Sequence, residues 1–145
     1  MHRRLQLHKG FYLFLFLAAS VLVIQSGCAP SGMVIDKSNF QTPVKRMYLT
    51  EEPFFKVWHG GLIQYIPLAK VQMVKINAAS SMVIADELFF SGEVIFKNGA
   101  KVQSSVDKTQ LNPVFISIHN TLKGKSKEQL FTISLENVTQ IQIKK

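Results

Sequence analysis

The stretch "IPLAKVQMVKI", residues 66–76, has a pattern of apolar residues that returns in "ISLENVTQIQI", residues 133–143. In both stretches the successive apolar residues are separated by two, three, three and two positions. A separation of two keeps side chains on one face of a strand, and a separation of three suits one tight helical turn. Each stretch therefore predicts a strand, a single turn and a second strand whose apolar side chains face one core.

The two stretches are related by a constant offset of 67 residues, and four of the five matched apolar residues are identical. An internal duplication would explain this match. Chance is the alternative, because 47% of the chain is hydrophobic. Pro67 cannot donate to a strand ladder, so we expect the first copy's leading strand at an edge or a bulge. The matched pairs are Ile66 with Ile133, Leu68 with Leu135, Val71 with Val138, Val74 with Ile141, and Ile76 with Ile143.

From Lys45 onward the chain has the pattern of consecutive strands. β-branched and aromatic residues alternate with polar ones, and no helical period of useful length appears. We therefore expect a mostly β protein, with a single antiparallel β-sandwich or barrel domain over residues 45–145 after an N-terminal signal peptide. The expected strands are 45–49, 53–58, 62–68, 71–77, 81–85, 92–97, 100–105, 113–118, 129–135 and 138–143.

The strongest local signal is "EVIFKNGAKVQS", residues 93–104. Asn98-Gly99 can adopt the positive φ angles of a type I′ turn, whose twist matches that of paired strands. Closing a two-residue turn there places Ile95 opposite Val102. The apolar pair would then lie on one face of the hairpin.

The N-terminal segment has the three parts of a secretory signal. The first ten residues contain Arg3, Arg4 and Lys9, residues 11–24 are almost entirely apolar, and Ser26-Gly27 follow. A helix needs roughly 20 apolar residues to cross a bilayer, so this segment is short for a permanent anchor. An uncleaved membrane helix extended through Gly27 is the alternative.

The five residues "IQSGC", residues 24–28, resemble the lipobox of bacterial lipoproteins. The resemblance implies cleavage after residue 27, a diacylglycerol on the Cys28 thiol and acylation of the new α-amino group. With Ala29 after the cysteine, it also implies a cell-envelope location, on the outer membrane if the cell has one. Cys28 is the single cysteine of the chain, so an intrachain disulfide is excluded. A buried structural cysteine is the alternative.

Processing would leave 118 residues with 14 basic and 9 acidic side chains, a net charge of +5 against +8 for the whole chain. Residues 28–44 mix Pro, Ser and Gly with single apolar residues, which predicts a tether between the lipid and the domain. A first strand at "MVI", residues 33–35, is the alternative.

The most suggestive stretch for binding is "FFKVWHGG", residues 54–61. As a strand, it would place Phe54 and Trp58 on one face and Phe55, Val57 and His59 on the other. We consider Phe54, Trp58 and His59 as ligand-binding residues, with an aromatic platform for a sugar ring. The alternative is that one aromatic face fills the core and Gly60-Gly61 form a turn.

No motif selects a catalytic residue or a cofactor. His59 and His119 are the histidines left after processing, and they lack metal-ligand spacing, so no metal is expected. Glu51-Glu52 and Asp86-Glu87 are expected as solvated loop charges, because neighbours in a strand point to opposite faces.

Two short basic clusters lie near the C-terminus, at residues 123–127 and 144–145. Both could contact anionic lipid head groups or cell-wall polymers, or form a solvated loop and tail. Nucleic acid is not an expected partner of an exported chain.

The leading hypothesis is a lipid-anchored, non-enzymatic binding or assembly module that meets an envelope protein or a cell-wall polymer. The alternative is a small envelope hydrolase acting on cell-wall sugars or peptides.

Overall fold

The computed structural model describes residues 28–102 and 114–144, and the mostly β, antiparallel class is confirmed. The expected signal peptide, residues 1–27, lies outside the described residues. The strands are β1 (Gly32–Asp36), β2 (Gln41–Leu49), β3 (Phe54–His59), β4 (Leu62–Pro67), β5 (Val71–Ile84), β6 (Glu87–Phe96), β7 (Phe115–Ser117), β8 (Thr121–Ser126), β9 (Gln129–Ser134) and β10 (Val138–Ile143). Two single 3₁₀ turns, η1 (Leu68–Lys70) and η2 (Leu135–Asn137), precede β5 and β10.

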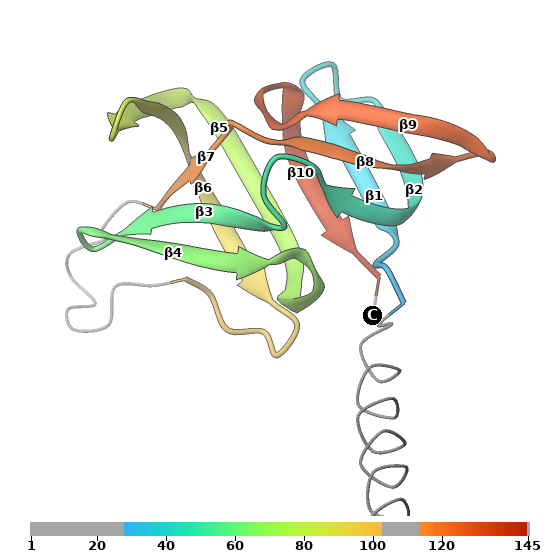
Figure 1. Ribbon diagram of the computed structural model, residues 1–145, viewed down its shortest axis with the longest axis horizontal. Coiled ribbons are helices and arrows are strands. Elements are labelled where there is room, and N and C mark those ends of the chain that lie inside the picture. Colours follow the sequence, from blue (N-terminus) through green and yellow to red (C-terminus); the bar gives the residue numbers. More distant parts are fainter. Residues whose placement is uncertain (1–27, 103–113, 145) are drawn as a thin grey trace, which may run out of the picture.

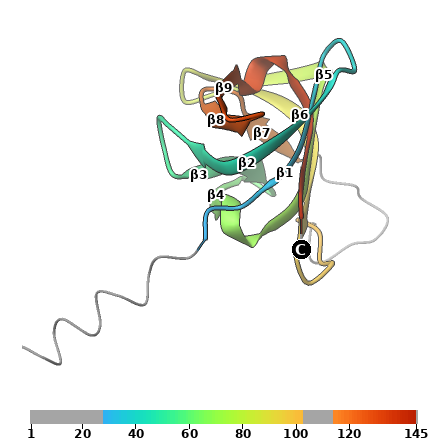
Figure 2. The ribbon, with the colours of Figure 1, turned by 90° about the vertical axis from the view of Figure 1, so that its right-hand side faces the viewer.

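The ten strands form one continuous sheet in the order β4-β3-β7-β6-β5-β10-β1-β2-β8-β9. Every neighbouring pair is antiparallel. The sheet curls at both sides, so that β3 and β4 on one side and β8 and β9 on the other turn toward the viewer in Figure 1, and Figure 2 shows the curl from the side. The structure is therefore a single curled sheet, and the expected sandwich or closed barrel is not confirmed.

The repeated sequence pattern corresponds to a repeated structure. β3, β4, η1 and the start of β5 recur as β8, β9, η2 and β10, with every one of these starting points shifted by 67 residues. The turns between the paired strands also match, since Gly60-Gly61 and Lys127-Glu128 all have positive φ angles. The match therefore extends well beyond the apolar positions that first indicated it, which supports duplication over chance.

The two copies meet at the centre of the sheet. β5 and β10 pair with Val74 opposite Ile141, which are themselves equivalent residues. The neighbouring pairs are Met73 with Gln142 and Lys75 with Gln140. The offset of 67 residues converts the residues of one pair into those of the other. The pairing thus has local two-fold symmetry about Val74 and Ile141, and it divides the sheet into two five-stranded halves.

The second half is completed by the N-terminal strands. β1 pairs with β10 as β6 pairs with β5, and Gly32 and Gly92 face the equivalent residues Ile143 and Ile76. The sequences agree as well, with "GMVI" at residues 32–35 and "GEVI" at 92–95. The first and last strands of the domain are therefore neighbours in the sheet, and beyond them the Lys144 N–H donates to the Ser31 carbonyl at 2.8 Å.

The apolar residues of the repeat form much of the core. Nine of the ten matched residues are buried, and Ile133 is the exception, partly buried against the same cluster. Burial of a large aliphatic side chain contributes about 1.5–3 kcal/mol, so these positions stabilise both halves and the seam between them. The core residues with no accessible surface include Val57, Val71, Val74, Val94, Ile116, Leu122, Leu135 and Ile141.

The expected start of the β domain at Lys45 is wrong. β1 and the first four residues of β2 lie within residues 28–44, which were expected to form a tether. Val34 is 1% exposed, because β1 is an inner strand between β10 and β2. The alternative of a first strand over residues 33–35 is the one confirmed, and within the expected tether only residues 28–31 precede the sheet.

Two expected strands are merged and one strand was missed. Residues 71–77 and 81–85 belong largely to the single strand β5, which continues through an irregularity in its pairing between Asn77 and Ser81. The missed strand is β8, most of which lies in the basic stretch that was considered as a loop. Its alternation of polar residues with Leu122 and Gly124 gave too little apolar signal.

The hairpin around Asn98-Gly99 forms with a shifted register. The Phe96 N–H donates to the Ala100 carbonyl at 2.7 Å, and Ile95 faces Lys101. Gly99 has a φ of 83°, while Asn98 does not have a positive φ. The loop therefore has three residues rather than two, with glycine in the left-handed position.

We expect the two equivalent glycines, Gly32 and Gly92, to be intolerant of a side chain. A Cβ at Gly32 would overlap the carbonyl oxygen of Gln142, and one at Gly92 would overlap that of Lys75. Gly32→Ala and Gly92→Ala should each lower the free energy of unfolding by about 3 kcal/mol. Gly99→Ala, which meets no atom within 4 Å, should cost about 1 kcal/mol through its positive φ. Urea unfolding would measure these differences, and equal losses for all three would contradict the packing explanation.

Candidate functional site

The two connections between the halves lie against each other. Residues 50–53 join β2 to β3, and residues 118–120 join β7 to β8, so both lead into a copy of the repeat. The Thr50 N–H donates to the Thr121 carbonyl at 3.1 Å. An open cleft of about 480 Å³ lies over them. Its polar lining residues are Glu51, Asp86, Glu87, His119, Asn120, Thr121, Ser134 and Glu136.

Asn120 fastens one connection to the other. Its side-chain oxygen accepts hydrogen bonds from the N–H groups of Thr50 and Glu51, each at 3.2 Å. Its side-chain nitrogen donates to the Glu52 carbonyl at 2.9 Å. Asn120 is 7% exposed. A buried amide with both of its polar atoms bonded acts as a crosslink, because the neighbouring backbone groups would otherwise lose their partners.

Glu51 makes a second link between the two connections. One of its carboxylate oxygens accepts from the Thr121 N–H at 2.6 Å and from the Thr50 hydroxyl at 2.7 Å. The hydrogen bond from Thr50 is the main reason why the pKa of Glu51 is lowered. Glu51 is therefore held in its charged form at the mouth of the cleft.

Glu87 belongs to a charged network on the same side. Lys56 Nζ lies 3.0 Å from Glu87 and 3.1 Å from Glu52, and the Ser117 hydroxyl donates to Glu87. Partial burial alone would raise the pKa of Glu87, but the hydrogen bonds from Ser117 and Lys56 and the nearby charges of Lys56 and His119 outweigh it and lower the pKa. The hydrogen bond to Glu87 raises the pKa of Lys56 most strongly.

These contacts indicate a structural and electrostatic role for the cleft residues. The Ser117 hydroxyl, which donates to Glu87, also accepts from the backbone N–H of His119 at 3.2 Å. An ionised Glu87 cannot serve as a general acid at neutral pH. Within residues 28–102 and 114–144, no group of three or more His, Cys, Asp or Glu residues is arranged to hold a metal ion. The arrangement presents negative charge and holds the two connections together.

The structure assigns different surroundings to the three expected binding residues. The predicted division of β3 into two faces is correct: Phe55, Val57 and His59 are buried, and Phe54 and Trp58 are partly exposed on the opposite face. His59 therefore does not share a surface with the other two. It is 6% exposed, and its Nε2 has no hydrogen-bond partner among the described residues.

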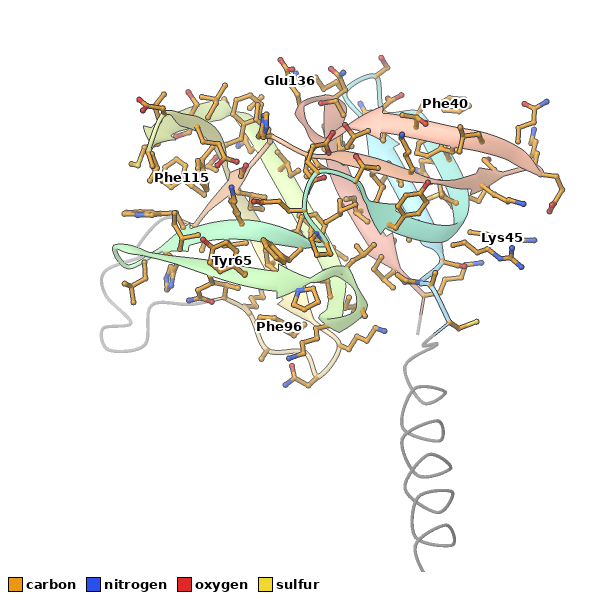
Figure 3. All side chains as sticks on the ribbon, viewed as in Figure 1. Phe40, Lys45, Tyr65, Phe96, Phe115 and Glu136 are labelled. Carbon is orange, nitrogen blue, oxygen red and sulfur yellow. The ribbon has the colours of Figure 1, made fainter. Side chains whose placement is uncertain are left out.

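Phe54 and Trp58 belong to an aromatic face formed by β3, β4 and β7. Phe54 packs edge-on against Tyr65, with ring centroids 4.8 Å apart. Trp58 packs in the same way against the buried Phe115, at 6.0 Å. Tyr65 is 57% exposed, and Figure 3 labels it on this face. The outer part of this face is thus open to a partner, while its inner part is packed.

Cys28 is an exposed free cysteine just before the sheet. The Pro30 carbonyl accepts from the Met47 N–H at 2.7 Å, so the chain is fixed to β2 two residues after the cysteine. Within the part of the chain that the structure describes, no helix has the length and apolar character needed to cross a membrane.

The acidic pairs are more than solvated loop charges, which corrects the expectation for them. Glu52 and Glu87, one from each pair, bind the same lysine, Lys56. His119 enters the cleft but His59 does not. Asn120 and Ser117 could not be predicted from the sequence, because a single amide or hydroxyl outside a motif carries no signal until distant segments are brought together.

Comparison of the chain with models of known protein families finds no match, and comparison with curated proteins finds none either.

We predict that Asn120→Ala lowers the free energy of unfolding by about 2 kcal/mol, because it removes the part-buried hydrogen bonds of the Glu51 N–H and the Glu52 carbonyl. Asn77→Ala is the matched control. Its side chain accepts one exposed hydrogen bond from Ala79, so the loss should be about 0.5 kcal/mol. Urea unfolding of both variants measures the difference, and similar losses would contradict the crosslinking role.

The lowered pKa of Glu87 predicts a pH dependence of stability. A carboxylate with a lowered folded-state pKa stabilises the fold above its unfolded-state pKa, ordinarily 4.5. This contribution is lost as the pH falls through the folded-state value. Glu87→Gln should therefore flatten the decrease in melting temperature below about pH 5. Glu128→Gln, in the exposed β8–β9 turn, serves as control, and an unchanged acid profile for Glu87→Gln would refute the prediction.

Proposed function

We propose that this chain is a lipid-anchored protein of the bacterial cell envelope, attached through Cys28 after removal of a signal peptide, with the β domain acting as a non-enzymatic binding or assembly module. The observation that supports the anchor best is the position of Cys28, which is exposed and free just before β1. A thiol left free in an oxidising compartment is a liability, and thioether lipidation would consume it.

The position of the cysteine suits an anchor for a second reason. Only residues 29–31 separate Cys28 from β1, and the Pro30 and Ser31 carbonyls are bonded to Met47 and Lys144. A lipid on Cys28 would therefore hold the folded domain at the bilayer surface with little slack. Two or three acyl chains would make such attachment nearly permanent, because each buried methylene contributes about 0.8 kcal/mol.

We assign the partner contact to the outer aromatic face of β3 and β4. Phe54, Trp58 and Tyr65 offer rings at its surface, and the neighbouring Leu62 is 70% exposed. Aromatic side chains with a polar tip are typical of contact surfaces for proteins and sugars. An envelope protein or a cell-wall polymer would fit this chemistry, and outer-membrane placement goes with Ala29 after the cysteine.

The alternative, an envelope hydrolase, draws on one observation. His119 lies in the same cleft as Glu51, Asp86 and Glu87. The hydrogen bonds of Glu51 and Glu87 weigh against it, because they hold both carboxylates in their charged forms and tie them to the fold. The binding module therefore remains the function that the geometry supports best.

Intact mass of the membrane-extracted protein tests the anchor. The expected mass lacks residues 1–27 and includes acyl groups, and Cys28→Ala should retain the full-length, unacylated chain. Ala29→Ser, which leaves the thiol in place, is the matched control and should be processed like the parent. A full-length, unacylated mass for the parent chain would overturn the proposal, because the apolar segment would then itself be the anchor.

A further inference from the structure

The end of the sheet's inner strands that lies next to Cys28 carries exposed basic side chains. We call it the anchored end. β1 and β2 meet there at Gly32 and Val44, and β5 and β6 at Val71 and Phe96. Figure 1 shows the C-terminal end of β10 at the same edge. Lys70 directly precedes β5, Lys97 directly follows β6 and Lys144 directly follows β10, while Lys45 and Arg46 lie within β2 directly after Val44. The five residues are Lys45, Arg46, Lys70, Lys97 and Lys144.

Acidic residues gather at the opposite end of the same strands. Asp36 ends β1, Asp86 lies in the turn between β5 and β6, and Glu136 lies in η2 just before β10. Figure 3 labels Glu136 at the top of the molecule, whereas Figure 1, in the same view, shows the C-terminal end of β10 at the bottom. Along β1, β5, β6 and β10, the end beside the anchor therefore carries the five cations, whereas the other end carries these three carboxylates together with Lys37.

This polarity is not a consequence of the duplication. η1 lies at the anchored end and contains Lys70, whereas the equivalent position in η2 is Asn137. Conversely, Glu136 of η2 corresponds to Ala69 of η1. The two copies share their apolar residues but differ in charge according to the end at which they lie.

The cations of the anchored end lack anionic partners in the described part of the chain. None of the three ion pairs found there includes one of them. Lys45 lies directly opposite Lys125 in the β2–β8 ladder, and like charges in that position repel. Arg46 sits in the irregular part of this ladder with a φ of 52°, a conformation that an L residue seldom adopts. Such a cluster is better accommodated beside an external anion.

The hydrogen bonds next to Cys28 bring this cluster close to any bilayer that holds its lipid. The Arg46 N–H donates to the Ser31 hydroxyl at 3.4 Å, and the Lys144 N–H donates to the Ser31 carbonyl. Three residues from Cys28 to Ser31 span at most about 11 Å. That reach is comparable with the Debye length of about 8 Å at physiological salt, so anionic head groups would act on these cations.

We propose that the anchored end is a docking surface for anionic phospholipid, which holds the domain upright on its membrane and directs the acidic cleft away from it. The inference rests on the proposed anchorage at the membrane and adds the identity of the lipid and the orientation of the domain. The phosphate groups of the lipid are the anions that the five cations would meet.

The test measures how fast individual lysines react with a water-soluble amine-acylating reagent, with peptide mass mapping as readout. Membrane-extracted protein is reconstituted in vesicles of phosphatidylcholine alone or with about 30% phosphatidylglycerol. On the anionic vesicles Lys70, Lys97 and Lys144 should react about five-fold more slowly, and about 0.5 M salt should abolish the difference. Lys37, at the far end of β1, should react equally on both.

A pair of charge-matched variants isolates the anchored end. Arg46→Gln/Lys70→Gln/Lys97→Gln should remove most of the protection of Lys144 on anionic vesicles. Lys37→Gln/Lys75→Gln/Lys127→Gln removes the same charge elsewhere and should leave that protection intact. Equal effects of the two variants would overturn the proposal, and so would equal reactivity of the parent lysines on both vesicles.

The outcome is separable from that of the proposed function. Intact mass of the same reconstituted sample reports whether Cys28 is acylated. An unacylated chain whose lysines are still protected on anionic vesicles would refute the lipid anchor and leave the docking surface standing. An acylated chain whose lysines are not protected would refute the docking surface and leave the lipid anchor standing.

Discussion

The pairing of β5 with β10 is the interaction on which the rest of the structure depends. It joins the two halves through equivalent residues, Val74 and Ile141, neither of which has accessible surface. Each five-stranded half would have an unpaired edge strand at this seam. β5 of one half pairs with the equivalent strand of the other, β10, so neither edge is left unpaired. Because the contact is self-complementary, the pattern that builds one half also supplies the partner for the other.

Two features close the molecule around this seam. β1 and β2 occupy in one half the places that β6 and β7 occupy in the other, so the N-terminal strands complete the copy that ends at the C-terminus. The connections at residues 50–53 and 118–120 are fastened by Asn120 on the other side. The pairing of β1 with β10 fixes the two ends of the domain beside each other, so Cys28 lies close to the start of a firmly paired strand.

The same architecture gives the domain two unlike ends and an aromatic side. Cations adjoin Cys28, while Glu51 and Glu87 lie in the cleft over the connections. A domain held by a lipid on Cys28 in the proposed orientation would direct the cleft away from its membrane. Stability, anchorage and recognition would then use separate surfaces, because the core residues of the repeat face inward throughout.

The sequence by itself determined the features that depend on local periodicity. These are the strand–turn–strand repeat, the division of β3 into a buried and an exposed face, and the presence of a turn near Gly99. The tertiary structure alone decided which strands pair, and so the place of β1, the crosslink made by Asn120 and the gathering of charge at the sheet ends. It also decided the turn at Lys127-Glu128, whose positive φ angles no local preference predicts. The physical reason is that local patterns fix only which face of a segment is apolar, whereas pairing is set by burial between segments that are distant in sequence.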